Sequence, residues 1–193
     1  HHDIWDYDVP SQPTFYDVEK DGKIIKALAQ TTKMGFVFLL NRETGEPIFP
    51  VEERDVPQGA VEGDYVTKTQ PFPTKPKPLT PTYLDPDDVF GFTPWDRGYC
   101  KKAAQDLRNE GLYTPPSLEG SVHYPSAIGG ANWGGPAIDS SRNILIANTM
   151  NLSSTIVMVP RSDCDKALKE LARDSVQSRF SALQQNEGTP YCT

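Results

Sequence analysis

A proline-rich stretch, PFPTKPKPLTPTYLDPDD at residues 71–88, limits what this chain can fold into more than any other feature of the sequence. Proline fixes φ, lacks a backbone N–H and restricts the residue before it, so helices and central strands do not run through such a stretch. We therefore expect an extended connection here, either ordered or semi-ordered. The whole sequence has 18 prolines and 37% hydrophobic residues. This composition predicts short strands and ordered loops rather than a helical bundle.

Residues 14–53 alternate apolar runs with turn signals. Asp21 and Gly22 are typical of a tight β-hairpin turn. The run at 35–42 is almost entirely apolar, which indicates a strand buried on both faces. Together these runs predict a four-stranded antiparallel meander of the size of one β-propeller blade. The strands expected after the hairpin turn are 23–32, 35–42 and 46–52.

The C-terminal part of the chain predicts more strands and two helices. Residues 117–160 repeat the strand–turn–strand rhythm and predict a second blade-like unit. A short helix is expected at 96–110, because apolar residues recur there at helical spacing and Gly111 can end it. The residues at helical spacing are Ala103, Ala104 and Leu107.

The clearest helical pattern covers residues 163–185, and Ser162 or Asp163 can cap its start. We expect this amphipathic helix to pack on the outside of the β structure. Its polar face mixes both signs of charge and lacks the basic bias that a surface of anionic lipid would favour. The apolar stripe is made by Leu168, Leu171, Ala172, Val176, Phe180 and Leu183.

Charge and cysteine spacing limit the partners and the chemistry. The net charge is −7 and no basic cluster is present, so nucleic acid is not an expected partner. No run approaches the about 18 apolar residues that a membrane-spanning helix needs. The three cysteines, Cys100, Cys164 and Cys192, match neither a zinc site nor a disulfide framework. One disulfide and three free thiols both remain open.

Two positions stand out as candidates for chemistry. The chain opens HHDIWDYD, where the Asp6 carboxylate follows an indole and two imidazoles. A carboxylate in such a place suits a general base, but a solvated loop residue shows the same pattern. Lys33 lies in TTKMG, before a strand too apolar to face water. It is either a solvated surface charge or a residue at the end of the sheet, where binding loops gather.

Three long segments carry a resemblance to a known family. They are HHDIWDYDVPSQP, TTKMGFVFLLNRETGEPIFPVEERDVPQGAVEGD and GLYTPPSLEGSVHYPSAIGGANWGGPAID, and the likeness returns at EGTPY near the end. The chain resembles the pyrroloquinoline quinone (PQQ)-dependent dehydrogenases, in particular the membrane-bound glucose, quinate and shikimate branch. Residues 74–98 and 163–187 match this pattern poorly.

The resemblance implies a mainly β fold, in which the chain is an internal segment of an eight-bladed β-propeller with a long proline-rich connection and an added amphipathic helix. A propeller of that size needs far more chain than 193 residues. Residues 1–193 then form one segment of a propeller domain. Its parts are a blade-like unit at 1–53, the proline-rich connection with a short helix at 54–116, a second blade-like unit at 117–160, and a helical insertion and tail at 161–193.

The resemblance also implies roles for particular residues. The family motif His-Asp-x-Trp-Asp places the catalytic aspartate at Asp6. The family's lysine follows that aspartate by 27 positions, which is Lys33, and hydrogen-bonds the quinone oxygens. Trp5, Asn132 and Trp133 are expected near the cofactor, although for Trp133 simple packing within a blade is an equal alternative. Two further expectations are that His2 and Asp3 orient the loop and that His123 is structural.

The implied cofactors are PQQ and a Ca²⁺ or Mg²⁺ ion. The main ligands of the ion are expected outside this segment, so no metal ligand is assigned here. The implied substrate is a sugar, a quinate- or shikimate-like cyclic acid or a polyol, and ubiquinone accepts the electrons. The implied location is the periplasmic side of the bacterial inner membrane. The rest of the propeller is an expected partner of this segment, and the segment by itself is expected to be inactive.

Two other functions compete with this interpretation. A non-catalytic β-propeller scaffold has no reason to keep Asp6 and Lys33 at the family spacing. A hydrolase built on a pair of carboxylates among Asp3, Asp6 and Asp8 would act without a redox cofactor.

Overall fold

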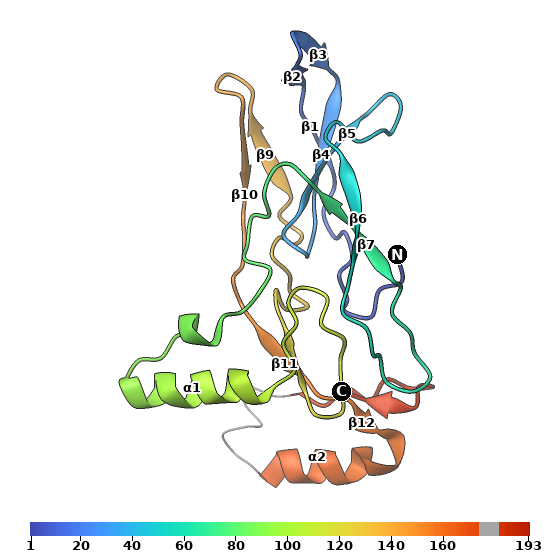
Figure 1. The fold of residues 1–193 in the computed structure, drawn as a ribbon, viewed down its shortest axis with the longest axis vertical. Coiled ribbons are helices and arrows are strands. Elements are labelled where there is room, and N and C mark those ends of the chain that lie inside the picture. The colour runs from blue at the N-terminus through green and yellow to red at the C-terminus, as the bar shows by residue number, and fades with distance from the viewer. Residues whose placement is uncertain (174–181) are drawn as a thin grey trace.

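The computed structural model describes residues 1–173 and 182–193. Short antiparallel strand pairs make up most of its regular secondary structure, and the two α-helices are both at the end opposite the hairpin tips (Figure 1). The first seven strands are β1 (Thr14–Phe15), β2 (Val18–Lys20), β3 (Lys23–Ile25), β4 (Ala27–Thr31), β5 (Val37–Asn41), β6 (Val51–Asp55) and β7 (Thr69–Pro73). The others are β8 (Ser121–His123), β9 (Pro136–Asp139), β10 (Ile144–Ala147), β11 (Ser154–Ile156), β12 (Val159–Pro160) and β13 (Tyr191–Cys192). The helices are η1 (Pro86–Asp88), α1 (Pro94–Asp106), η2 (Arg161–Asp163) and α2 (Cys164–Arg173).

The N-terminal strands follow the predicted hairpin pattern in part. Asp21 and Gly22 both have positive φ, 51° and 73°, and join β2 to β3 as the turn signal predicts. Strands β1, β4 and β5 form a sheet in that order, with Ala29 opposite Leu39. Alternate residues of β4 are buried, so one face of this sheet packs on the interior. The prediction of a mainly β chain is confirmed.

The predicted fourth strand of this meander pairs elsewhere. Pro47 makes only an isolated bridge with Leu40, and β6 pairs with β7 from the proline-rich connection instead. Strand β7 can contain Pro71 and Pro73 because it is the outer strand of a two-stranded pair, where a missing N–H costs little. Within the described ranges the largest sheet therefore has three strands, and a four-stranded blade does not form.

The second β region contains two separate strand pairs. Strands β9 and β10 form a hairpin around the Ser-Ser-Arg-Asn turn, and β11 pairs with β8. Helix α1 begins at Pro94, with the Thr93 side chain accepting from the backbone N–H of Asp96 at 3.2 Å. It ends before the expected stop at Gly111, because Arg108 leaves the helix and bridges to Ser121 in β8.

The predicted amphipathic helix is only partly described. Helix α2 covers Cys164–Arg173, residues 182–185 are not helical, and the predicted Val176 and Phe180 lie outside the described residues. Leu168 is exposed, so this part of the stripe is not packed against the strands. A disulfide joins Cys164 to Cys192, whereas Cys100 is free. This cross-link attaches the start of α2 to β13, which pairs with β12.

The larger of the two core clusters brings together segments that are far apart in the sequence. It contains residues from the opening loop, from the position just before β5, from the position just after β6 and from the loop before β8. The buried members are Trp5, Tyr7, Phe36, Val56, Leu112 and Tyr113. The opening motif is therefore part of the interior of the protein, rather than a free terminal arm.

Candidate active site

The carboxylate of Asp3 organises the opening loop. Its two oxygens accept hydrogen bonds from the backbone N–H groups of Trp5 (2.8 Å) and Tyr7 (2.7 Å). The side chains of both residues point inward: the Trp5 indole donates to the carbonyl of Thr114 at 2.8 Å, and the Tyr7 hydroxyl donates to the carbonyl of Pro125 at 2.7 Å. Because side chains alternate along the loop, Asp6 and Asp8 point outward.

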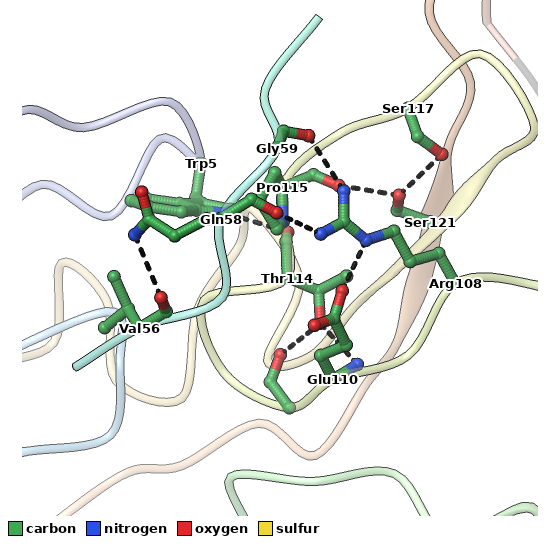
Figure 2. A network of polar contacts seen from close by, with 11 residues as sticks. Trp5, Val56, Gln58, Gly59, Arg108, Glu110, Thr114, Pro115, Ser117 and Ser121 are labelled. Atoms are coloured by element: carbon green, nitrogen blue, oxygen red, sulfur yellow. Dashed lines mark hydrogen bonds and ion pairs between the residues drawn. The ribbon is translucent and has the colours of Figure 1, made fainter. Parts of the chain in front are cut away.

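A network of polar contacts joins the segments around the indole of Trp5 (Figure 2). Arg108 donates to the carbonyls of Gln58 and Gly59, the latter at 2.9 Å, and pairs with Glu110. These contacts join the VPQG segment to the chain that carries Thr114, the acceptor of the Trp5 indole N–H. The resemblance-bearing segments are therefore hydrogen-bonded to one another in three dimensions.

His2 is held on the same side of the loop. Its Nε2 lies 3.0 Å from a carboxylate oxygen of Asp64, and its ring stacks on Tyr65 with 4.2 Å between ring centroids. The contact with Asp64 occupies Nε2, and the stacking on Tyr65 fixes the plane of the ring. These contacts agree with the expectation that His2 and Asp3 orient the loop.

Asp6 and Lys33 meet directly. The Lys33 ammonium lies 2.9 Å from a carboxylate oxygen of Asp6 and 2.5 Å from one of Asp8. The lysine side chain is only 9% exposed, whereas that of Asp6 is 69% exposed. Burial by itself lowers the pKa of Lys33, but the hydrogen bonds to Asp8 and Asp6 and the charges of both carboxylates together raise it above its usual value. Lys33 is therefore a permanent cation, shared by two carboxylates.

The backbone around Lys33 is fixed by a glycine loop that follows β8. Gly130 donates its N–H to the carbonyl of Lys33 at 2.6 Å, and Ala131 donates to that of Thr32 at 3.3 Å. Gly129 has φ of 80°, and a Cβ there would lie 2.6 Å from Cγ of Lys33. Only glycine permits this approach, so the loop packs directly on the lysine.

The same loop carries Asn132 and Trp133. The Asn132 amide donates to the carbonyl of Ile128 at 2.6 Å and its oxygen accepts from the N–H of Trp133 at 2.9 Å. The Trp133 side chain is free of the core, because the residue is 81% exposed. The structure brings the backbone of this loop to Lys33, but it does not bring the two side chains into contact with Asp6 or Lys33.

A pocket of about 520 Å³ opens beside the opening loop. Asp3, Trp5 and Asp6 line one side of it, and residues of β8 and β11 line another, including His123. Lys33 lies next to this pocket through its ion pair with Asp6. A volume of this order is typical of small-molecule sites.

Two residues at this site were missed as functional candidates by the sequence interpretation. Asp8 was considered only for a carboxylate-pair hydrolase, and here it holds Lys33 together with Asp6. The alternation Asp6-Tyr7-Asp8 was the signal that places both carboxylates on one side. His123 was expected to be structural; it lines the pocket, and no local pattern indicates this.

No set of three or more His, Cys, Asp or Glu side chains in residues 1–173 and 182–193 is arranged to hold a metal ion. Nor does any helix in these ranges have the length and apolar character needed to cross a membrane.

Comparison with known proteins identifies the family. The PQQ family, described as the β-propeller domain of glucose, ethanol and alcohol dehydrogenases, matches residues 1–193. The chain belongs to this family. The resemblance based on the three sequence segments is therefore confirmed, and so is the propeller fold class.

The relatives of this PQQ-family chain are dehydrogenases by name. It is 40% identical over 193 residues to a quinoprotein glucose dehydrogenase of Gluconobacter oxydans and 37% identical over 198 residues to that of Escherichia coli. It is also 32% identical over 192 residues to a quinate/shikimate dehydrogenase (quinone) of Acinetobacter baylyi. In each case 99% of this chain is covered, but only 24% of the relative. No solved structure matches the chain significantly.

Proposed function

We propose that the full-length protein containing this chain is a PQQ-dependent dehydrogenase that oxidises a hydroxyl group of a sugar, a quinate- or shikimate-like cyclic acid or a polyol. Ubiquinone accepts the electrons, and the enzyme acts on the periplasmic side of the bacterial inner membrane. The observation that carries this proposal is the contact of Asp6 with Lys33 at the rim of a pocket, in a chain that belongs to the PQQ family.

The residues on this chain fit a quinone cofactor. An ammonium group has three N–H donors, and the contacts to Asp6 and Asp8 use two of them. One donor of Lys33 is thus left for a quinone oxygen. Trp5 lies in the same loop as Asp6, and Asn132 and Trp133 lie in the glycine loop whose backbone is hydrogen-bonded to that of Lys33. These three residues are proposed to lie near the cofactor. A Ca²⁺ or Mg²⁺ ion would take its main ligands from other parts of the full-length protein.

Asp6 is the proposed general base. Its side chain is largely exposed toward the pocket, and its single ion pair leaves carboxylate lone pairs free for a substrate hydroxyl. Taking that proton leaves the alkoxide, from whose carbon the hydride departs as the carbonyl forms. When bound, PQQ supplies the acceptor for these two electrons. Lys33 holds Asp6 in place and keeps a positive charge beside the developing negative charge.

The backbone of Asp6 is held in an unusual conformation, with φ of 60°. The inward anchors of Trp5 and Tyr7 on either side of Asp6 maintain it. Non-glycine residues rarely adopt this region, and such strain is concentrated at functional sites. This supports a role for Asp6 beyond that of a solvated loop residue.

The test uses the full-length protein, reconstituted with PQQ and Ca²⁺ or Mg²⁺, in a dye-linked oxidation assay with glucose, quinate, shikimate and glycerol. We expect turnover of at least one of them. Asp6→Asn should reduce kcat by roughly 10²–10⁴-fold, the usual contribution of a general base, while PQQ still binds. Full activity of Asp6→Asn would remove the assigned role. No turnover with any substrate, together with no absorbance change on adding PQQ, would instead favour a non-catalytic scaffold.

A further inference from the structure

His123 is a buried residue whose two ring nitrogens are unpaired within residues 1–173 and 182–193. It ends strand β8 opposite Ser154 of β11, and the residue is only 3% exposed. Neither Nδ1 nor Nε2 has a hydrogen-bond partner among the described residues. Buried polar side chains in native proteins are nearly always hydrogen-bonded. An imidazole with both nitrogens unpaired therefore indicates a hydrogen-bond partner that is not among the described residues.

The neighbours of His123 pack against its ring but form no hydrogen bond with its nitrogens within the described residues. The ring of Tyr7 packs against it with 5.0 Å between ring centroids. The Tyr7 hydroxyl does not serve the imidazole, because it donates to the carbonyl of Pro125. The imidazole is therefore fixed in position by packing, while its two buried nitrogens stay unpaired among the described residues.

The pocket beside Asp6 is the place where this partner can be found. His123 and Asp6 both line it. The described residues of its lining also include the carboxylates of Asp3 and Asp64, and no lysine or arginine is among them. A lining of this charge disfavours a carboxylate-bearing ligand and is compatible with a neutral, hydroxyl-rich one.

The protonation state of His123 matches such a ligand. Burial lowers its pKa to about 4, with a smaller opposing effect from the Asp6 carboxylate and a smaller lowering effect from Lys33. At neutral pH the imidazole is thus uncharged, with one nitrogen that donates and one that accepts. A hydroxyl group also donates and accepts, so the two are complementary.

We propose that His123 is a substrate-binding residue that hydrogen-bonds a hydroxyl group of a neutral polyhydroxy substrate, next to the hydroxyl that Asp6 deprotonates. This rests on the proposed dehydrogenase function. Asp6 takes the proton, and His123 fixes the orientation of the substrate by a second contact. Orientation by two contacts places the reacting hydroxyl toward Asp6.

The experiment compares variants of the full-length protein, reconstituted with PQQ. His123→Phe retains the buried ring and removes both nitrogens, and His123→Gln retains a donor and an acceptor. His1→Phe makes the same chemical change at a ring that pairs with Glu53 outside this pocket. We expect His123→Phe to raise KM for glucose roughly tenfold, the effect of one lost hydrogen bond, with a smaller change in His123→Gln and none in His1→Phe.

A second readout does not depend on turnover. In the Asp6→Asn background, the Kd for glucose is measured by calorimetry with and without His123→Phe. The PQQ affinity of the same variants is measured by titration, and their Tm by thermal unfolding. Weaker glucose binding at unchanged PQQ affinity supports the proposal. Loss of PQQ affinity with unchanged KM, a lower Tm without a change in glucose binding, or a wild type that oxidises only quinate and shikimate would overturn it. An inactive wild type would count against the dehydrogenase function itself.

Discussion

Tryptophans occupy two contrasting regions of this chain. Trp5, in the opening loop, is 2% exposed, and its indole N–H is hydrogen-bonded to the carbonyl of Thr114. Trp95, in the first turn of α1, is 83% exposed, and its sequence neighbours Phe90, Phe92 and Tyr99 are exposed as well. The indole of Trp5 is thus covered by contacts inside the described chain, whereas the aromatic residues around α1 have no cover there. Apolar content alone did not distinguish the two regions.

The contrast can be tested most strongly by truncating both indoles. Trp5→Ala should lower the free energy of unfolding by about 3–5 kcal/mol, because it removes a buried ring and leaves a buried carbonyl unpaired. Trp95→Ala should change it by no more than about 0.5 kcal/mol. Denaturant unfolding of the full-length protein measures both. Similar losses for the two variants would show that the α1 region is buried in the complete protein.

The pH dependence of stability tests the buried region of this comparison, to which His123 belongs. The pKa of His123 is lowered to about 4 from an unfolded value of about 6.5. Between these values the unfolded chain binds more protons than the folded one, so stability falls as the pH decreases from 6.5 to 4. We expect His123→Phe to remove roughly 1–3 kcal/mol of this loss. Unfolding curves at pH 7, 5 and 4 check this, and an unchanged pH profile would contradict it.

The smallest expected changes in stability come from a comparison of two lysines. Lys33 is buried against Asp6 and Asp8, whereas Lys26 pairs with Glu43 at 3.0 Å on the surface. Lys33→Met should weaken PQQ binding roughly tenfold, through the loss of one charge-assisted hydrogen bond. It should change stability by only about 1 kcal/mol, because the exposed carboxylates become hydrated.

Lys26→Met is the matched control, and it should alter neither PQQ binding nor, measurably, stability. Titration of PQQ fluorescence compares the two variants. Equal PQQ affinities would contradict the placement of Lys33 at the cofactor.

Local sequence rules predicted the parts of the fold that neighbouring residues control. Asp21 and Gly22 form the expected hairpin turn because both adopt positive φ at little cost. Strands β9 and β10 are joined at the expected turn. Helix α1 ends earlier than its apolar spacing indicated, because Arg108 pairs with β8, a long-range contact that no helical periodicity contains.

The candidate site also divides into features that the sequence indicated and features that depend on long-range contacts. Asp6 and Lys33 were identified by the resemblance to the family motif, since residue type alone also fitted a solvated loop residue and a surface charge, and the structure places their charged groups 2.9 Å apart. The roles assigned to them, and to Trp5, Asn132 and Trp133, remain predictions. The contribution of Asp8 to the ion pair was not predicted, since it depends on which face of the loop meets Lys33.

The sequence by itself determined the family, the β character of the chain, the turns, and the presence of an aspartate and a lysine at the positions of the family motif. Only the tertiary structure decided that β6 pairs with β7, that Cys164 pairs with Cys192 and that Lys33 is buried. It also decided that the ring of His123 has no hydrogen-bond partner in the described part of the chain. These features depend on which distant segments meet and exclude water from one another. Strand pairing, desolvation and hydrogen-bond satisfaction are properties of that assembly, and no local pattern of residues encodes them.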